Sequence, residues 1–124
     1  MTTLKATLFH TSGEKFFLKG EELRTKYGTI YSNQINKGYG VVQSEKGEKF
    51  LAVEPSTQDI VESFKMGGRP IYPYDAGTIC SLLDIKPGKK VLEAGTGSGG
   101  LTFFMTTLGA EVISYEKEEE FHEK

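Results

Sequence analysis

Four glycines fall within the six residues GTGSGG, 95–100, which follow the apolar run VLEA and precede LTFF. Glycine loses more backbone entropy on folding than any other residue, so four of them together indicate that something must approach the main chain closely. A strand, a glycine-rich loop and a helix, in that order, place backbone amides and a helix N-terminus at an open crevice. The segment therefore predicts a ligand-binding loop.

Two carboxylates flank this loop. Glu116 lies 21 residues after Gly95, at the end of the next predicted strand, where it can accept hydrogen bonds from both hydroxyls of a ribose. Glu93 lies two positions before the first glycine, where a carboxylate would repel a pyrophosphate but suits an ammonium or sulfonium cation. The loop also matches the dinucleotide pattern GxGxxG, so a nicotinamide-dependent oxidoreductase stays open. Glu93 favours S-adenosylmethionine as the ligand.

The segments around the loop predict one strand, helix, strand unit of a parallel sheet. Residues 90–94 and 111–116 are short and apolar, as expected of strands. Gly109 is expected to end the helix between them. The apolar residues of that helix lie at i, i+3, i+4 and i+7: Leu101, Phe104, Met105 and Leu108.

The segments on either side of this unit predict two further helices. Asp75 is expected to cap a helix that runs to about Leu83, with Ile79, Leu82 and Leu83 on its apolar face and Cys80 as a packed core thiol. Residues 117–124 are expected to open another helix, because early glutamates suit its N-terminal dipole.

The first 54 residues predict a small β meander or barrel. His10 is expected at its surface or edge, and Gly47 in the turn of a hairpin. Short runs rich in β-branched and aromatic residues predict the strands, within 6–12, 14–20, 28–32, 39–45 and 48–55. The expected core aromatics are Phe16, Phe17, Tyr27, Tyr31 and Tyr39.

A helix capped by Ser or Thr is predicted within 56–66, before the stretch GGRPIYPYDAG. The glycines and prolines of that stretch are typical of a linker, so a boundary is placed near 66–73. The predicted domains are a β-rich domain with a closing helix, 1–66, and the start of a Rossmann-like domain, 67–124. The fold class is therefore α/β.

Composition excludes several classes of protein. Mean hydropathy is −0.35, and no apolar run approaches the ~18 residues of a membrane span. The N-terminus does not resemble a secretory signal and there is one cysteine, so a cytoplasmic location is expected. The net charge is +2 for 1–54, 0 for 55–110 and −4 for 111–124, which permits a nucleic-acid partner without indicating one. No metal ligand is predicted.

The segment IYPYDAGTICSLLDIKPGKKVLEAGTGSGGLT, followed by YEK at the second strand, resembles a known family. It is similar to the tRNA (adenine-N1) methyltransferases that modify adenosine 58 of the T-loop. The resemblance implies a small N-terminal β domain followed by a class I S-adenosylmethionine-dependent methyltransferase domain. It also implies a tRNA partner, which the N-terminal domain helps to hold, and a homotetramer.

The resemblance also implies roles for individual residues. Tyr72, Pro73 and Asp75 would lie near the cofactor, Glu116 would hold the ribose hydroxyls, and the segment from Lys117 to Phe121 would border the adenine. The methionine side of the cofactor would be lined by Glu93, Gly95, Thr96, Gly97, Ser98, Gly99, Gly100 and Leu101.

The resemblance covers only part of such an enzyme. A Rossmann-like sheet needs more than the two strands predicted here, so the sequence is expected to be the N-terminal portion of a longer protein. The aspartate that the family places after its fourth strand has no counterpart, so no catalytic residue is assigned. A non-catalytic module for tRNA docking or assembly is the alternative.

Overall fold

The computed structural model describes residues 3–64 and 71–119 and divides the chain into two units, 1–63 and 64–124. The predicted boundary at 66/67 lies outside the described residues, so the division into domains 1–66 and 67–124 stays a prediction. Each unit has a hydrophobic core of its own.

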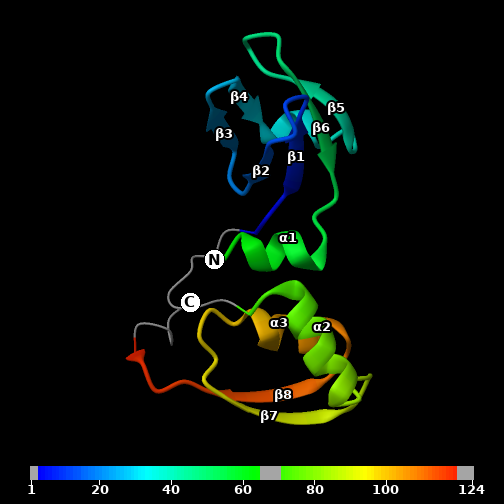
Figure 1. Ribbon diagram of the computed structural model, residues 1–124. Helices are drawn as coiled ribbons and strands as arrows, with labels where there is room; N and C mark the ends of the chain where they lie inside the picture. The colour runs from blue at the N-terminus through cyan, green and yellow to red at the C-terminus, as the bar shows by residue number, and fades with distance from the viewer. Residues whose placement is uncertain (1–2, 65–70, 120–124) are drawn as a thin grey trace. The chain divides into compact units, whose positions relative to one another are not determined.

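The first unit is built on an antiparallel sheet with the strand order β2-β1-β6-β5 (Figure 1). Gly47, with φ of 84°, lies in the turn between β5 and β6, as predicted. The strands of this sheet are β1 (Ala6–His10), β2 (Lys15–Leu18), β5 (Gly40–Gln43) and β6 (Lys49–Val53).

A separate antiparallel hairpin and a short 3-10 helix complete the β part of the unit. The hairpin pairs β3 (Glu22–Thr25) with β4 (Gly28–Tyr31), and η1 (Ser32–Gln34) follows directly. The sequence analysis missed β3, because its residues ELRT lack the aromatic and β-branched run by which the other strands were found.

The core of the first unit follows the two-residue period of its strands. Tyr27 and Phe16 pack at its border, as predicted, but Tyr31 and Tyr39 are 46% and 50% exposed, and that part of the prediction is wrong. Ile30 takes the inward position on β4, and its neighbour Tyr31 therefore points out. The buried residues are Ala6, Leu8, Leu18, Ile30, Val42, Phe50 and Ala52.

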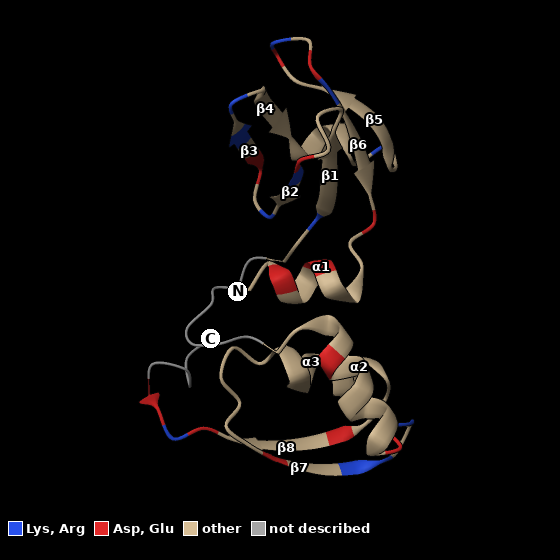
Figure 2. Cartoon of the chain, viewed as in Figure 1, with Lys and Arg blue, Asp and Glu red and all other residues tan. Residues whose placement is uncertain are grey.

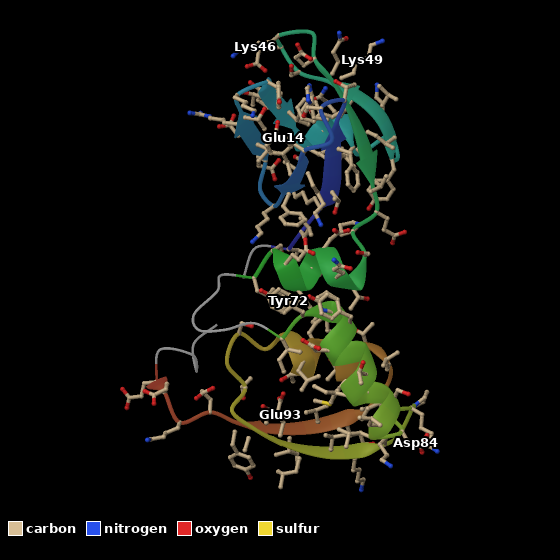
Figure 3. All side chains as sticks on the ribbon, in the orientation of Figure 1. Glu14, Lys46, Lys49, Tyr72, Asp84 and Glu93 are labelled. Atoms are coloured by element: carbon tan, nitrogen blue, oxygen red, sulfur yellow. The ribbon has the colours of Figure 1, made fainter. Side chains whose placement is uncertain are left out.

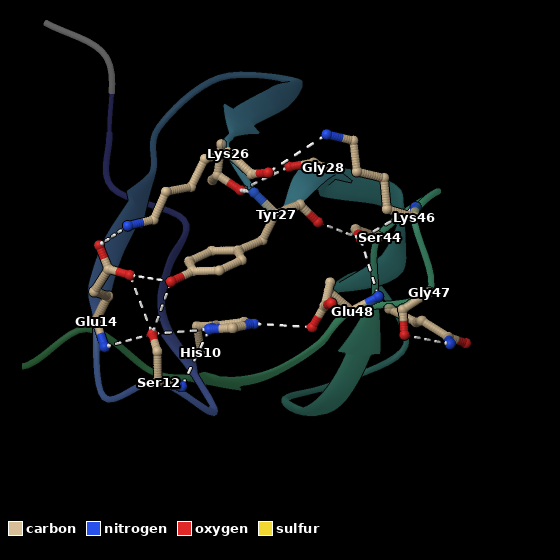
Figure 4. A network of polar contacts seen from close by, with 12 residues as sticks. His10, Ser12, Glu14, Lys26, Tyr27, Gly28, Ser44, Lys46, Gly47 and Glu48 are labelled. Carbon is tan, nitrogen blue, oxygen red and sulfur yellow. Dashed lines mark hydrogen bonds and ion pairs between the residues drawn. The ribbon is translucent and has the colours of Figure 1, made fainter.

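His10 is buried, at 7% exposure, so its predicted surface position is wrong. It shares the inward parity of Leu8 on β1, whereas the more apolar Phe9 points outward. The backbone amide of Ser12 donates to Nδ1 over 3.1 Å. The proton therefore lies on Nε2, which donates to Glu48 over 3.1 Å (Figure 4). The ring stacks on Tyr27 with centroids 3.6 Å apart.

Helix α1 (Thr57–Glu62) packs beside this sheet and begins with the predicted cap. The hydroxyl of Ser56 accepts from the amide of Asp59 over 3.1 Å, and the Asp59 carboxylate accepts from the amide of Ser56 over 3.0 Å. Lys15 on β2 pairs with Asp59 at 3.1 Å and with Glu62 at 2.5 Å. The helix is therefore tied both at its start and along one side.

The second unit contains the predicted strand, helix, strand arrangement. β7 (Lys90–Ala94) pairs in parallel with β8 (Glu111–Tyr115), and α3 (Gly100–Thr107) connects them. Helices α2 (Pro73–Leu82) and α3 lie on the same face of this pair (Figure 1). Buried Cys80, as predicted, packs there with Met105 and Ala110, while the opposite face exposes Leu92, Ile113 and Tyr115.

The structure corrects the predicted details of α2. Tyr72 occupies the N-cap position and Pro73 the first turn, so Asp75 lies within the first turn and is not the cap. Leu82 is 81% exposed and Leu83 is also exposed, whereas Ala76 and Cys80 are buried. The inward stripe therefore passes through small residues that allow close packing. The predicted helix within 117–124 lies largely outside the described residues.

No helix in the described part of the chain is both long and apolar enough to cross a membrane.

The pKa of Glu14 provides a test of the network around His10. The hydroxyl of Tyr27 donates to the Glu14 carboxylate, Lys26 pairs with it at 2.9 Å, and together they lower its pKa from 4.5 to about 2. These bonds therefore stabilise the fold above pH 4.5, and their contribution is lost as the pH falls toward 2. In Tyr27→Phe we expect the pKa of Glu14, measured by NMR titration, to rise toward its ordinary value. Lys26 should still hold this pKa somewhat below that value.

Tyr39→Phe is the matched control, because the Tyr39 hydroxyl donates to the carbonyl of Lys5 and not to this network. A Glu14 titration that is the same in Tyr27→Phe as in the wild type would contradict the assignment.

Candidate functional site

The glycine loop joins the end of β7 to the start of α3 in a backbone conformation that requires glycine. Gly95, Gly97 and Gly99 have φ of 90°, 54° and 80°, in the left-handed region that residues with a side chain rarely adopt. A Cβ atom built on any of the three would meet no other atom within 4 Å. The turn therefore favours glycine at these positions, and the space beside them is open.

Three consecutive residues at the end of β8 hold three consecutive residues of the loop. The carbonyl of Tyr115 accepts from the amides of Gly95, over 2.7 Å, and Thr96, over 3.3 Å. The hydroxyls of Ser114 and Thr96 are hydrogen-bonded to each other. The carboxylate of Glu116 accepts from the amide of Gly97 over 2.7 Å.

Glu116 therefore lies directly beside the glycine loop, as the sequence predicted. Its Oε2 accepts from Gly97, and its Oε1 accepts from the amides of Lys117 and Glu118 over 2.8 and 3.0 Å. These main-chain donors fix the carboxylate at the carboxyl end of the parallel pair, where such sheets bind ligands.

Glu93 lies on β7 and is half-buried on the side of the sheet that α3 covers (Figure 3). Its Oε2 accepts from the hydroxyl of Ser114 over 2.5 Å and from the hydroxyl of Thr102 on α3. The two hydroxyl donors hold this carboxylate in place between β8 and α3.

The remaining predicted residues fall into three groups. Ser98 is half-buried within the loop, and Gly100 is buried at the first position of α3. Leu101 packs against the core formed by Cys80, Met105 and Ala110, so its side chain has a structural role. Lys117 is exposed, and Phe121 lies outside the described residues.

The upstream segment presents two tyrosine rings to solvent at the start of α2. Tyr72 and Tyr74 are exposed and stack with centroids 5.7 Å apart and an angle of 7° between their planes. Tyr72 was expected near the cofactor together with Pro73 and Asp75. The structure places all three in one helical turn, which leaves that expectation a proposal.

Sequence reasoning missed Ser114 and Thr102. Both are hydroxyl residues on half-buried faces, and neither belongs to the glycine pattern or to the carboxylate spacing. The two-residue period of β8 is the one signal that could have identified Ser114, since it gives Ser114 the same parity as the inward Val112.

Among the described residues, no group of three or more His, Cys, Asp or Glu side chains could hold a metal ion. The described groups around the loop are backbone amides, the carboxylates of Glu93 and Glu116, and the hydroxyls of Thr96, Thr102 and Ser114.

Residues 21–124 match the family model of the protein-L-isoaspartate (D-aspartate) O-methyltransferases. The chain belongs to this methyltransferase family. Two structures solved by crystallography show the same fold. An S-adenosylmethionine-dependent O-methyltransferase from Thermotoga maritima is 27% identical, with a TM-score of 0.82 over 94% of this chain and 46% of its own. These matches confirm the predicted fold class, a small β domain followed by the first part of a Rossmann-like methyltransferase domain.

The second structure and the curated relatives confirm the resemblance to tRNA (adenine-N1) methyltransferases. The solved tRNA (m1A58) methyltransferase TrmI from Aquifex aeolicus is 30% identical, with a TM-score of 0.73, and covers 94% of this chain and 47% of its own. The tRNA (adenine(58)-N(1))-methyltransferase TrmI of Thermus thermophilus is 44% identical over 62% of this chain. A Methanocaldococcus jannaschii enzyme named for adenines 57 and 58 is 34% identical over 88%.

The chain spans less than half the length of these relatives: 31% of the Thermus protein and 40% of the Methanocaldococcus protein.

The bond between Glu116 and Gly97 predicts the dynamics of the loop. In Glu116→Ala the amide of Gly97 loses a charged acceptor, and bonds of this kind contribute about 1.5–3 kcal/mol. We expect hydrogen exchange at the Gly97 amide to accelerate by about tenfold or more. Glu118→Ala is the control, because no described bond joins the Glu118 side chain to the loop. Unchanged exchange at Gly97 in Glu116→Ala would show that the loop is held without this bond.

Proposed function

We propose that this chain binds S-adenosylmethionine at the glycine loop and belongs to an enzyme that methylates N1 of adenine in tRNA. The observation that carries the proposal is the placement of Glu93 and Glu116 on either side of the open loop, each fixed by hydrogen bonds. The family and the relatives consist of methyltransferases, which supports this cofactor over a nicotinamide dinucleotide.

The residues present fit this cofactor. The open space beside Gly95, Gly97 and Gly99 admits a ligand against the main chain. Glu116, at the carboxyl end of β8, suits the hydroxyls of a ribose. The proposed neighbours of the adenine are Lys117, which is exposed, and Phe121, which lies outside the described residues. Glu93 suits the ammonium group at the amino-acid end of the cofactor. A pyrophosphate would be repelled at the same place.

The methyl group to be transferred is what the bound cofactor supplies. This chain contributes the binding and orientation of that donor: the open side of the loop admits the ligand, and the two carboxylates fix its two ends. Because the donor is already oriented when it is bound, less entropy is lost on reaching the in-line geometry for transfer. No residue of this chain is assigned to proton transfer.

The relatives favour tRNA as the acceptor over a protein carboxylate. The Thermus tRNA methyltransferase matches 80 residues of this chain, and the Methanocaldococcus one matches 114. A protein-L-isoaspartate O-methyltransferase from Christiangramia forsetii is 48% identical but over only 52 residues. These two tRNA enzymes therefore match a longer part of the chain than this isoaspartate enzyme does. Because the family model carries the isoaspartate name, methylation of isoaspartyl peptides is the second candidate.

The tRNA would also be the partner of the first unit. We further propose that the whole protein is cytoplasmic and forms a homotetramer, as the resemblance to the tRNA (adenine-N1) methyltransferases implies. A non-catalytic docking or assembly module remains the alternative. It predicts cofactor or tRNA binding without methyl transfer.

Cofactor binding can be tested on the chain itself with Gly97→Ala. The added methyl meets no protein atom within 4 Å, so it would project into the open space proposed for the ligand. At φ of 54° we expect a cost to folding of only about 1–2 kcal/mol. Calorimetry should therefore show S-adenosylmethionine binding in the wild type and its loss in the variant, with NADH binding in neither. Binding of NADH, or equal cofactor binding by both proteins, would contradict the proposal.

Methyl transfer is tested with the protein isolated from its natural source and radiolabelled S-adenosylmethionine. We expect label in tRNA as 1-methyladenosine, and no label in a tRNA whose T-loop adenosine is replaced by guanosine. Label on an isoaspartyl peptide and none on tRNA would favour the second candidate. Cofactor binding with no transfer to either acceptor would favour the docking module.

A further inference from the structure

Two hydroxyls from different elements donate to Glu93, and a third hydroxyl is connected to it through one of them. Ser114 from β8 donates to Glu93 Oε2 over 2.5 Å, and Thr102 from α3 donates to the same oxygen. Thr96 of the glycine loop is hydrogen-bonded to Ser114. A carboxylate on one strand is thus connected to the helix, to the neighbouring strand and to the loop.

The chemistry of the groups fixes the direction of each bond. An ionised carboxylate only accepts, so Ser114 and Thr102 must both use their protons on Glu93. The hydroxyl of Ser114 then has only lone pairs left for Thr96, so Thr96 donates to Ser114. The result is a chain of hydrogen bonds that runs from Thr96 through Ser114 to Glu93. Consecutive bonds of such a chain strengthen one another in a partly buried site.

Both of the bonds that Glu93 accepts fall on one oxygen, Oε2. Within residues 3–64 and 71–119, no group donates a hydrogen bond to the other oxygen, Oε1. The two donors on Oε2 therefore fix the rotation of the carboxylate and leave Oε1 as its available acceptor.

We propose that Ser114 and Thr102 are positioning residues that hold Glu93 so that Oε1 accepts from the ammonium of the methionine moiety of S-adenosylmethionine. The inference rests on the proposed cofactor and goes beyond it, because neither hydroxyl belongs to the glycine loop or to the carboxylate pair. Ser114 is in turn hydrogen-bonded to Thr96 of the loop.

The two ends of the ligand depend on different residues of the chain. The nucleoside end depends on Glu116, whereas the amino-acid end depends on Glu93 and the hydroxyls that hold it. Loss of a hydroxyl should therefore weaken only those ligands that carry an α-ammonium group. A purely structural role in packing the loop would weaken every ligand.

The experiment compares three ligands by calorimetry on the full chain: S-adenosylmethionine, S-adenosylhomocysteine and 5′-methylthioadenosine, which lacks the amino-acid part. We expect Ser114→Ala and Thr102→Ala each to weaken the first two by about tenfold, as for loss of a charge-assisted hydrogen bond. Binding of 5′-methylthioadenosine should change by less than about twofold. Thr102→Ser keeps the hydroxyl and should retain binding close to the wild type.

Thr107→Ala is the matched control on α3, because the Thr107 hydroxyl donates only to the carbonyl of Phe103, away from Glu93. It should bind all three ligands as the wild type does. Thermal unfolding of each variant identifies any that fails to fold.

A double-mutant cycle with Glu93→Gln provides the decisive readout. If Ser114 acts through the carboxylate, Ser114→Ala should cost little further affinity once Glu93 is replaced. Equal weakening of all three ligands by Ser114→Ala, or additive losses in the cycle, would overturn the inference and leave the proposed function intact. A wild-type chain that binds none of the ligands would overturn both.

Discussion

The hydrogen bonds between the end of β8 and the glycine loop are the interaction on which the candidate site depends. Parallel pairing places Ala94 opposite Tyr115, so the loop leaves β7 directly beside the last residues of β8. Side chains and a carbonyl at 114–116 can then hold the amides and hydroxyl of 95–97 in register. A shift of one residue in this pairing would place Ser114 and Glu93 on opposite faces of the sheet, so that they could not meet.

The same bonds explain how a loop rich in glycine can be ordered. Gly95, Gly97 and Gly99 have little conformational restriction of their own, and each adopts a left-handed conformation. Their order comes from acceptors on the neighbouring strand. Because these acceptors lie on the strand side, the opposite side of the loop stays open for a ligand. Rigidity on one side and open space on the other are what a preorganised binding loop requires.

The first unit uses polar groups differently. Its His10, Ser12, Glu14 and Tyr27 bond chiefly to one another or to nearby carboxylates, which ties the strands and turns together (Figure 4). Its lysines and its arginine are spread over several of its strands and turns (Figure 2). Charge alone therefore does not select a docking face for tRNA on this unit. At the candidate site, by contrast, the loop leaves open space and one oxygen of Glu93 is available.

The sequence by itself determined the local elements and the main features of the site. Two-residue and 3.6-residue periods predicted most strands and the helix after the loop, and the glycine cluster with Glu93 and Glu116 pointed to the candidate loop. The burial of His10, the exposure of Leu82 and the bonds of Ser114 and Thr102 to Glu93 follow from the tertiary structure alone. Thr102 lies 9 residues and Ser114 lies 21 residues from Glu93 along the chain. Their bonds exist because strand register and helix packing bring three elements together, and no local period records that geometry.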